Sequence, residues 1–124
     1  MNRVALMGRL TTDPQLRNTP SGNSVLNFSL AVRRAFMREG GPDADFINCV
    51  AWKGTAEFIA KYFTKGKQIA IDGRLETSSW ENERKEKRYK TEVIVEHAYF
   101  TGEKPQSSDG FTELGAYNED DLPY

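Results

Sequence analysis

Aromatic residues with cations beside them recur at three places in this chain of 124 residues. The three are Phe36 after Arg33 and Arg34, Trp52 before Lys53, and Trp80 before a basic stretch that contains Arg84, Lys85, Lys87 and Arg88. An aromatic ring can stack on a nucleobase, a contact of about 1–3 kcal/mol, while a neighbouring cation binds the phosphate. Because every base has a π face, such contacts depend little on base sequence. The pattern therefore predicts a surface for single-stranded nucleic acid.

The segment 45–52 indicates which way two further candidate side chains point. Its residues alternate between the two faces of a strand, and one set is small or apolar, as the interior of a narrow barrel requires: Ile47, Cys49 and Ala51. Phe46 and Trp52 then lie on the outer face, about 20 Å apart at the usual rise of a strand. The alternative places both rings in the core and Ile47 and Cys49 outside. The cations near Phe36, Trp52 and Trp80 favour the first arrangement.

Five segments have the alternation of strands, and one has the period of a helix. The strands are expected at residues 2–10, 24–34, 45–52, 68–77 and 88–100, and the helix at 56–63. Three strands, one helix and two strands are the order found in the five-stranded Greek-key barrel called the OB-fold. We therefore predict an all-β OB-fold barrel with one helix between its third and fourth strands.

The sequence also predicts where the helix begins and ends and which residues of the helix and the fourth strand face the core. Thr55 is the expected N-cap of the helix, and Lys65-Gly66 is the expected stop. The residues expected to face the core are Phe58, Tyr62 and Phe63 in the helix, and Ile69, Ile71, Gly73 and Leu75 in the fourth strand. Residues 81–87 form a charged hairpin connection directly after Trp80.

The net charge of −1 conceals two parts of opposite sign. Residues 1–102 contain 16 Lys/Arg against 12 Asp/Glu, whereas residues 103–124 contain one Lys against six acids. A basic body favours polyanions, and an acidic tail favours basic protein pockets. We expect a flexible linker at 103–118 and a protein-interaction tip formed by Glu119, Asp120, Asp121, Leu122, Pro123 and Tyr124.

Enzymatic chemistry has little support in this sequence. Cys49 is the only cysteine and His97 the only histidine, and no metal-ligand cluster or glycine-rich phosphate loop is present. A lone cysteine of this kind behaves as a small hydrophobic residue, and His97 has a structural role in the same interpretation. We expect no cofactor and no metal. The sequence has no signal peptide and no apolar run of about 20 residues, which predicts a soluble cytoplasmic protein.

Several segments together resemble the bacterial-type single-stranded DNA-binding protein family. Residues 2–10 with 13–17 are similar to its opening strand and turn, 45–52 to its third strand, 56–62 with 65–66 to its helix and stop, and 72–75 and 91–93 to its last two strands. The resemblance implies an OB-fold that assembles as a homotetramer and wraps single-stranded DNA in replication, recombination and repair. It also implies a nucleoid-associated protein whose acidic tip recruits replication and repair enzymes.

The same resemblance assigns the stacking rings to Phe36, Phe46, Trp52 and Trp80. The family often has Trp at positions 36 and 46, and Phe at the last position of the tip, where this chain has Tyr124. The cations expected to contact phosphates are Arg3, Arg9, Arg33, Arg34, Lys53, Arg74, Arg84, Lys85, Lys87 and Arg88. Arg17 is equally compatible with a phosphate contact and with a turn cation. Two other function classes stay open: an OB-fold that prefers RNA, and a protein-interaction module in which the tail is the active part.

Overall fold

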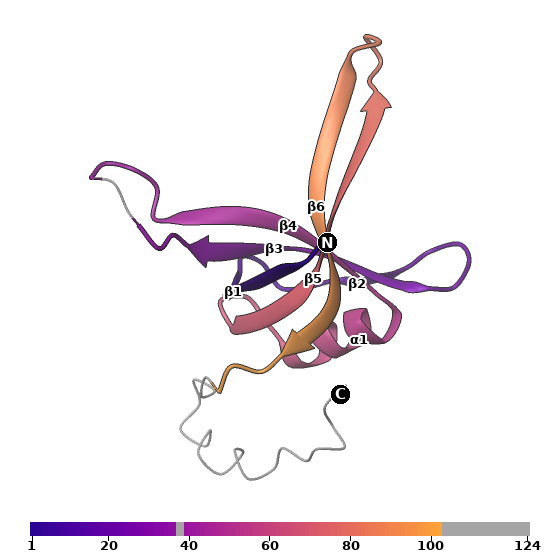
Figure 1. Ribbon diagram of the computed structural model, residues 1–124. Coiled ribbons are helices and arrows are strands. Elements are labelled where there is room, and N and C mark those ends of the chain that lie inside the picture. Colours follow the sequence, from indigo (N-terminus) through magenta and orange to yellow (C-terminus); the bar gives the residue numbers. More distant parts are fainter. Residues whose placement is uncertain (37–38, 103–124) are drawn as a thin grey trace.

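A computed structural model describes residues 1–36 and 39–102 (Figure 1). Its elements are β1 (Val4–Leu10), β2 (Leu16–Asn18), β3 (Ser24–Arg33), β4 (Ala44–Trp52), α1 (Lys53–Tyr62), β5 (Gln68–Glu81) and β6 (Lys87–Tyr99). The helix is ten residues long, so no helix in the described residues is long enough to cross a membrane. The linker and the tip predicted at 103–124 lie outside the described residues.

The strands close into the predicted barrel. The sheet order is β1-β5-β6-β4-β3-β2, and an additional pairing of β1 with β3 joins the two sides. β4 and β6 run parallel and pair at only three positions, Cys49 with Val93, Val50 with Ile94 and Ala51 with Val95. The predicted OB-fold is confirmed. The sixth strand, β2, was not predicted, because three residues beside a turn are too few to show alternation.

Two arms extend from the barrel (Figure 1). One is formed by the ends of β3 and β4, and the other by the β5–β6 hairpin, which projects in a different direction. β5 continues to Glu81, beyond the predicted end at residue 77. Asn82 organises the hairpin turn, because its Oδ1 accepts the backbone N–H groups of Arg84 and Glu86, each at 2.9 Å.

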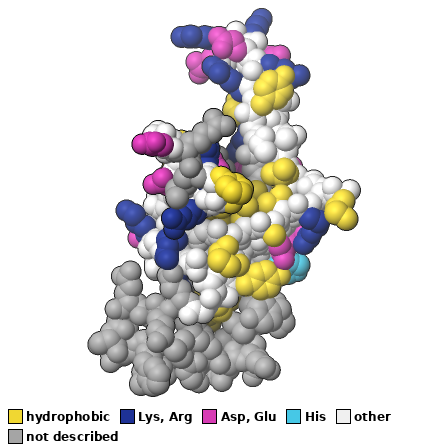
Figure 2. Space-filling model, turned by 60° about the vertical axis from the view of Figure 1, so that its left-hand side comes forward, with side chains coloured by type: hydrophobic (Ala, Val, Ile, Leu, Met, Phe, Trp, Pro, Cys, Tyr) yellow, Lys and Arg dark blue, Asp and Glu magenta, His cyan; other side chains and the backbone are white. Residues whose placement is uncertain are grey.

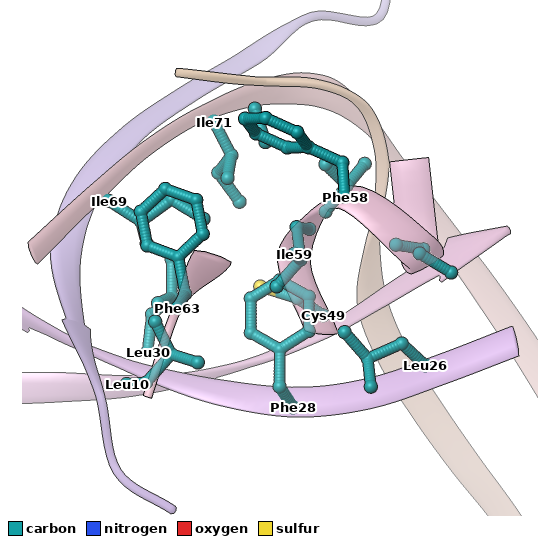
Figure 3. Packing of buried hydrophobic residues seen from close by; sticks show 14 of the residues in the cluster. Leu10, Leu26, Phe28, Leu30, Cys49, Phe58, Ile59, Phe63, Ile69 and Ile71 are labelled. Carbon is teal, nitrogen blue, oxygen red and sulfur yellow. The ribbon is translucent and has the colours of Figure 1, made fainter. Parts of the chain in front are cut away.

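The core lies between the barrel strands and α1. Figure 3 shows Phe58 and Ile59 pointing from the helix towards Ile71, Cys49 and the β3 residues Leu26 and Phe28. The prediction that Phe58 and Phe63 belong to the core is confirmed, with 7% and 1% of each residue exposed, and Tyr62 packs against the same cluster. The predicted helix stop at Lys65-Gly66 is wrong, because α1 ends at Tyr62 and Phe63 already has an extended backbone with a φ of −122°. Gly66, with a φ of +84°, belongs to the turn that follows the helix.

The start of the helix differs from the prediction. α1 begins at Lys53, and the N-cap position belongs to Trp52, whose side chain makes no capping hydrogen bond. Thr55, the expected N-cap, instead lies within the helix, and its hydroxyl donates to the carbonyl oxygen of Glu96 at 3.4 Å. The hydroxyl thus ties α1 to β6, a long-range contact that a local capping rule could not anticipate.

Cys49 behaves as a small apolar residue, as expected. Its exposed fraction is 1%, and burial raises the pKa of the thiol to about 12. The expectation for Leu75 is wrong, since 47% of this residue is exposed. The pairing of β1 with β5 ends at Gly73, so β5 has left the barrel at Leu75. There the side chain of Asn2 takes the place of a strand partner and exchanges two hydrogen bonds of 2.9 Å with the Leu75 backbone.

A β-bulge bends the sheet where the hairpin leaves the barrel. Asp72 pairs with His97 but Gly73 pairs with Val95, so Glu96 is an extra residue on β6. The backbones approach closely here: a Cβ built on Gly73 would lie 1.9 Å from the carbonyl oxygen of Ile94. Glycine is therefore required at this point of the barrel.

Candidate nucleic-acid interface

The outer face of β4 carries the two rings that alternation placed there. Phe46 is 71% exposed and Trp52 is 41% exposed, whereas Cys49 and Ala51 are buried. The alternative arrangement, with both rings in the core, is wrong. Val50 lies on the same outer face but is buried against two other outward residues, Val25 and Ile94. These three side chains form a small apolar floor outside the main core.

A groove, the outer groove, crosses this floor. It has a volume of about 410 Å³ and adjoins a second hollow of about 350 Å³, with which it shares Asn27, Lys90 and Glu92. The side chains around the groove are Arg17, Asn18, Thr19, Pro20, Val25, Asn27, Val50, Trp52, Lys90 and Glu92. On this side of the molecule, hydrophobic side chains gather at the foot of the projecting hairpin, and charged side chains crowd its tip (Figure 2).

The other two predicted rings lie on the arms. Phe36, just beyond the end of β3, is 91% exposed, and Trp80 on the hairpin is 49% exposed. Trp80 pairs across the hairpin with Arg88, whereas the neighbouring pair is Ser79 with Tyr89. Because successive residues of a strand alternate between faces, Trp80 and Tyr89 lie on opposite faces of the hairpin. All four candidate rings are thus available to a ligand.

The predicted cations of the hairpin follow Trp80 in the sequence and are exposed. They are Arg84, Lys85, Lys87 and Arg88. Arg88 also forms an ion pair of 3.2 Å with Glu86, and the Nζ of Lys87 lies 5.7 Å from the ring centre of Tyr89. Lys53 is exposed beside Trp52 and adopts a φ of +55° where the strand turns into the helix. Arg33 is exposed at the end of β3.

Three other predicted cations are held by groups of the protein itself. Arg3 pairs with Asp72 at 3.4 Å and with Glu96, and Arg74 pairs with Glu96 at 3.3 Å. The hydrogen bond from Arg3 is the main reason that the pKa of Glu96 lies below its usual range. Arg9 donates to the carbonyl oxygen of Gly66 at 2.9 Å. The structure does not place these three cations at the outer groove, whose lining includes none of them.

His97 belongs to the same ion-pair network. Its Nδ1 lies 2.7 Å from Asp72, whose second carboxylate oxygen accepts the hydroxyl of Tyr99 at 2.7 Å. Asp72, Glu96 and His97 bring three potential metal-ligand atoms within 4.8 Å of one another. Arg3 and Arg74 already neutralise both carboxylates, so this cluster is better explained as a structural tie between β1, β5 and β6.

Arg34 is a predicted phosphate contact that is held by one carboxylate of the protein, that of Asp45. Its guanidinium forms a two-pronged contact with Asp45, with Nε 3.1 Å from each carboxylate oxygen and a terminal nitrogen 2.7 Å from one of them. Both side chains are about half exposed. The hydrogen bond from Arg34 also holds the pKa of Asp45 below its usual range.

We predict that Asp45→Asn strengthens binding of single-stranded DNA, because it frees Arg34 for a phosphate. One additional phosphate contact corresponds to about a fivefold gain at 0.1 M salt and adds about 0.7 to the slope of log Kd against log salt concentration. Fluorescence anisotropy with a labelled oligomer at several salt concentrations measures both quantities. Asp43→Asn removes the same charge without freeing an arginine among the described residues. An equal gain from both variants would show that net charge, not Arg34, is responsible.

Several residues of the outer groove were not predicted from the sequence. Asn27, Asn48, Lys90 and Glu92 line the groove or the adjoining hollow, and Arg17, which was left undecided, also lies there. They come from β2, β3, β4 and β6. Only the register of these strands brings them together, and the sequence around each of them is that of an ordinary solvated strand.

Comparison with known proteins agrees with this geometry. The model of the single-strand binding protein family matches residues 1–101. Single-stranded DNA-binding protein A of Bacillus subtilis is 45% identical over 120 residues, which cover 96% of this chain and 68% of that protein. The single-stranded DNA-binding protein of Bacillus cereus is 46% identical, with 96% and 69% covered. That of Enterococcus faecalis is 41% identical, with 100% and 66% covered. The chain therefore belongs to the single-strand binding protein family.

Proposed function

We propose that this protein binds single-stranded DNA without regard to sequence and protects it during replication, recombination and repair. The observation that carries the proposal is the set of four exposed rings, one of which, Trp52, lines the outer groove together with Arg17 and Lys90. The chain's relatives are named single-stranded DNA-binding proteins, and the family is not enzymatic.

Binding in this proposal rests on two kinds of contact. Bases stack on Phe36, Phe46, Trp52 and Trp80, while phosphates lie against the exposed cations of the arms and the groove. The rings are on both arms and at the foot between them, so a strand that contacts all four follows a curved path over the barrel. Such a path is compatible with wrapping around an assembly of several subunits.

We further propose a homotetramer that works in the cytoplasm and on the nucleoid. One edge of β1 supports self-association: β1 pairs with β5 from Val4 to Arg9 but with β3 only at Arg9 and Leu10. In the described part of the chain, residues 4–7 therefore pair with no strand on that side. An open edge of this kind can pair with a second copy, and Met7 on the same strand is 54% exposed. The acidic tip at 119–124 recruits partner enzymes of replication and repair in this proposal.

Titration with a dT oligomer tests the central claim. Stacking on Trp52 and Trp80 is expected to quench their fluorescence, and Kd is expected to rise with salt by a slope of about 0.7 for each phosphate contacted. Unchanged emission at stoichiometric DNA would contradict stacking. Salt-independent or absent binding would favour the protein-interaction module, and tighter binding of a matched RNA would favour the RNA-binding alternative.

A further inference from the structure

Glu92 is an unexpected residue for a groove that binds a polyanion. It lies in the outer groove and in the adjoining hollow, and only 18% of its side chain is exposed. Its Oε2 is 3.3 Å from the Nζ of Lys90, and this is its one side-chain partner among the residues that the structure describes. A carboxylate offers about four acceptor sites, so most of its hydrogen-bonding capacity points to a ligand or to water.

The charges around the groove determine how a strand can lie in it. A phosphate close to Glu92 would be repelled, whereas Arg17 attracts phosphates. Arg17 lines the same groove, together with the apolar side chains of Val25 and Val50, while Lys90 is paired with Glu92. The arrangement favours a strand whose backbone follows Arg17 and whose bases turn inward, towards the apolar floor and Glu92.

A base turned inward presents its edge to the polar side chains around Glu92. Glu92 only accepts hydrogen bonds when ionised, and Asn48 and Asn27 beside it can donate and accept. The exocyclic amine of cytosine is a donor, whereas thymine has a carbonyl oxygen, an acceptor, at the same position. A carboxylate thus attracts the amine and repels the carbonyl oxygen.

We propose that Glu92 is a specificity-determining residue of the outer groove: it accepts a hydrogen bond from the exocyclic amine of a base held near Trp52, and so favours cytosine over thymine. This inference rests on the proposed binding of single-stranded DNA. It adds a local base preference to a surface whose stacking contacts are indifferent to sequence.

The test compares dC20 with dT20, two pyrimidine oligomers that offer the same number of phosphates. Kd for each is measured by anisotropy with the full chain, at a salt concentration where both bind measurably. Glu92→Gln is expected to shift the ratio of the two Kd values towards dT20 by about fivefold, since the amide loses the negative charge and can donate to the thymine carbonyl.

Glu76→Gln is the matched control. Glu76 pairs with Glu92 across the hairpin strands and lies near Arg74, but it does not line the groove. This control is expected to leave the ratio unchanged.

A second measurement uses the unaltered protein and so does not depend on the folding of a variant. An oligomer of 2-pyrimidinone nucleotides, which are cytosines without the amino group, is expected to bind about fivefold more weakly than dC20. Equal binding of these two oligomers, or an equal shift of the ratio in Glu92→Gln and Glu76→Gln, would overturn the role of Glu92 while leaving the proposed function intact. If the unaltered protein binds none of the oligomers, the proposed function and this inference fail together.

Discussion

Replacing Trp52 with alanine is expected to weaken binding of a dT oligomer by about 10- to 100-fold. Of the four candidate rings, Trp52 is the one that lines the outer groove, beside the apolar floor and at the end of β4. Loss of one stacked base corresponds to about 1–3 kcal/mol. The side chain makes no helix-capping hydrogen bond, so the substitution removes the ring without removing a cap. Anisotropy with labelled dT oligomers at several salt concentrations measures the loss.

Two control variants separate stacking from general effects. Trp52→Phe keeps an aromatic face and should lose only a small part of the affinity. Tyr89→Ala removes a ring that is 72% exposed but lies on the face of the hairpin opposite to Trp80, so Kd should remain near that of the unaltered protein. The proposal for Trp52 would be wrong if Tyr89→Ala lost as much affinity as Trp52→Ala.

Gly73→Ala is expected to destabilise the fold by about 3 kcal/mol or more, or to prevent folding. The new Cβ would lie 1.9 Å from the carbonyl oxygen of Ile94 and 2.9 Å from its carbonyl carbon. Both atoms belong to the backbone of β6 at the bulge, where they cannot move without breaking strand pairing. A loss of this size lowers Tm by about 15 °C in a domain of about 100 residues, which thermal unfolding followed by circular dichroism would detect.

Gly54→Ala is the matched control for this prediction. Gly54 lies within α1, and a Cβ added there meets no atom within 4 Å. Alanine is a better helix former than glycine, so this variant should be stabilised by about 0.5 kcal/mol. Similar melting temperatures for the two variants would show that the close approach at Gly73 is not a constraint on the fold.

The sequence predicted the barrel well because its strands have one face in the core. Leu26, Phe28 and Leu30 alternate with more polar residues in β3, and all three are buried as that pattern requires. The same argument placed Phe46 and Trp52 outside, where the structure has them. The positions of exposed rings could therefore be predicted from the positions of the buried residues between them.

The outer groove could not be predicted in this way, since it depends on which strands are neighbours. Lys90 and Glu92 reach β4 only because β4 and β6 pair in parallel over three residues. Local rules also failed where distant contacts decide the outcome: Thr55 bonds to β6 instead of capping α1, and Leu75 is exposed because β1 ends before it. Hydrophobic periodicity contains no information about such pairings.

Two of the exposed rings are separate from the core, so their positions can accept substitutions that the core positions cannot. Phe36 and Phe46 are absent from the buried cluster that holds the barrel together, and each is more than two-thirds exposed. Substitutions at these two positions can therefore be selected for their effect on ligand affinity with almost no penalty in folding. A library of aromatic and synthetic fluorescent side chains at positions 36 and 46 would sample affinity alone, which makes this barrel a tolerant scaffold for evolution and for sensors.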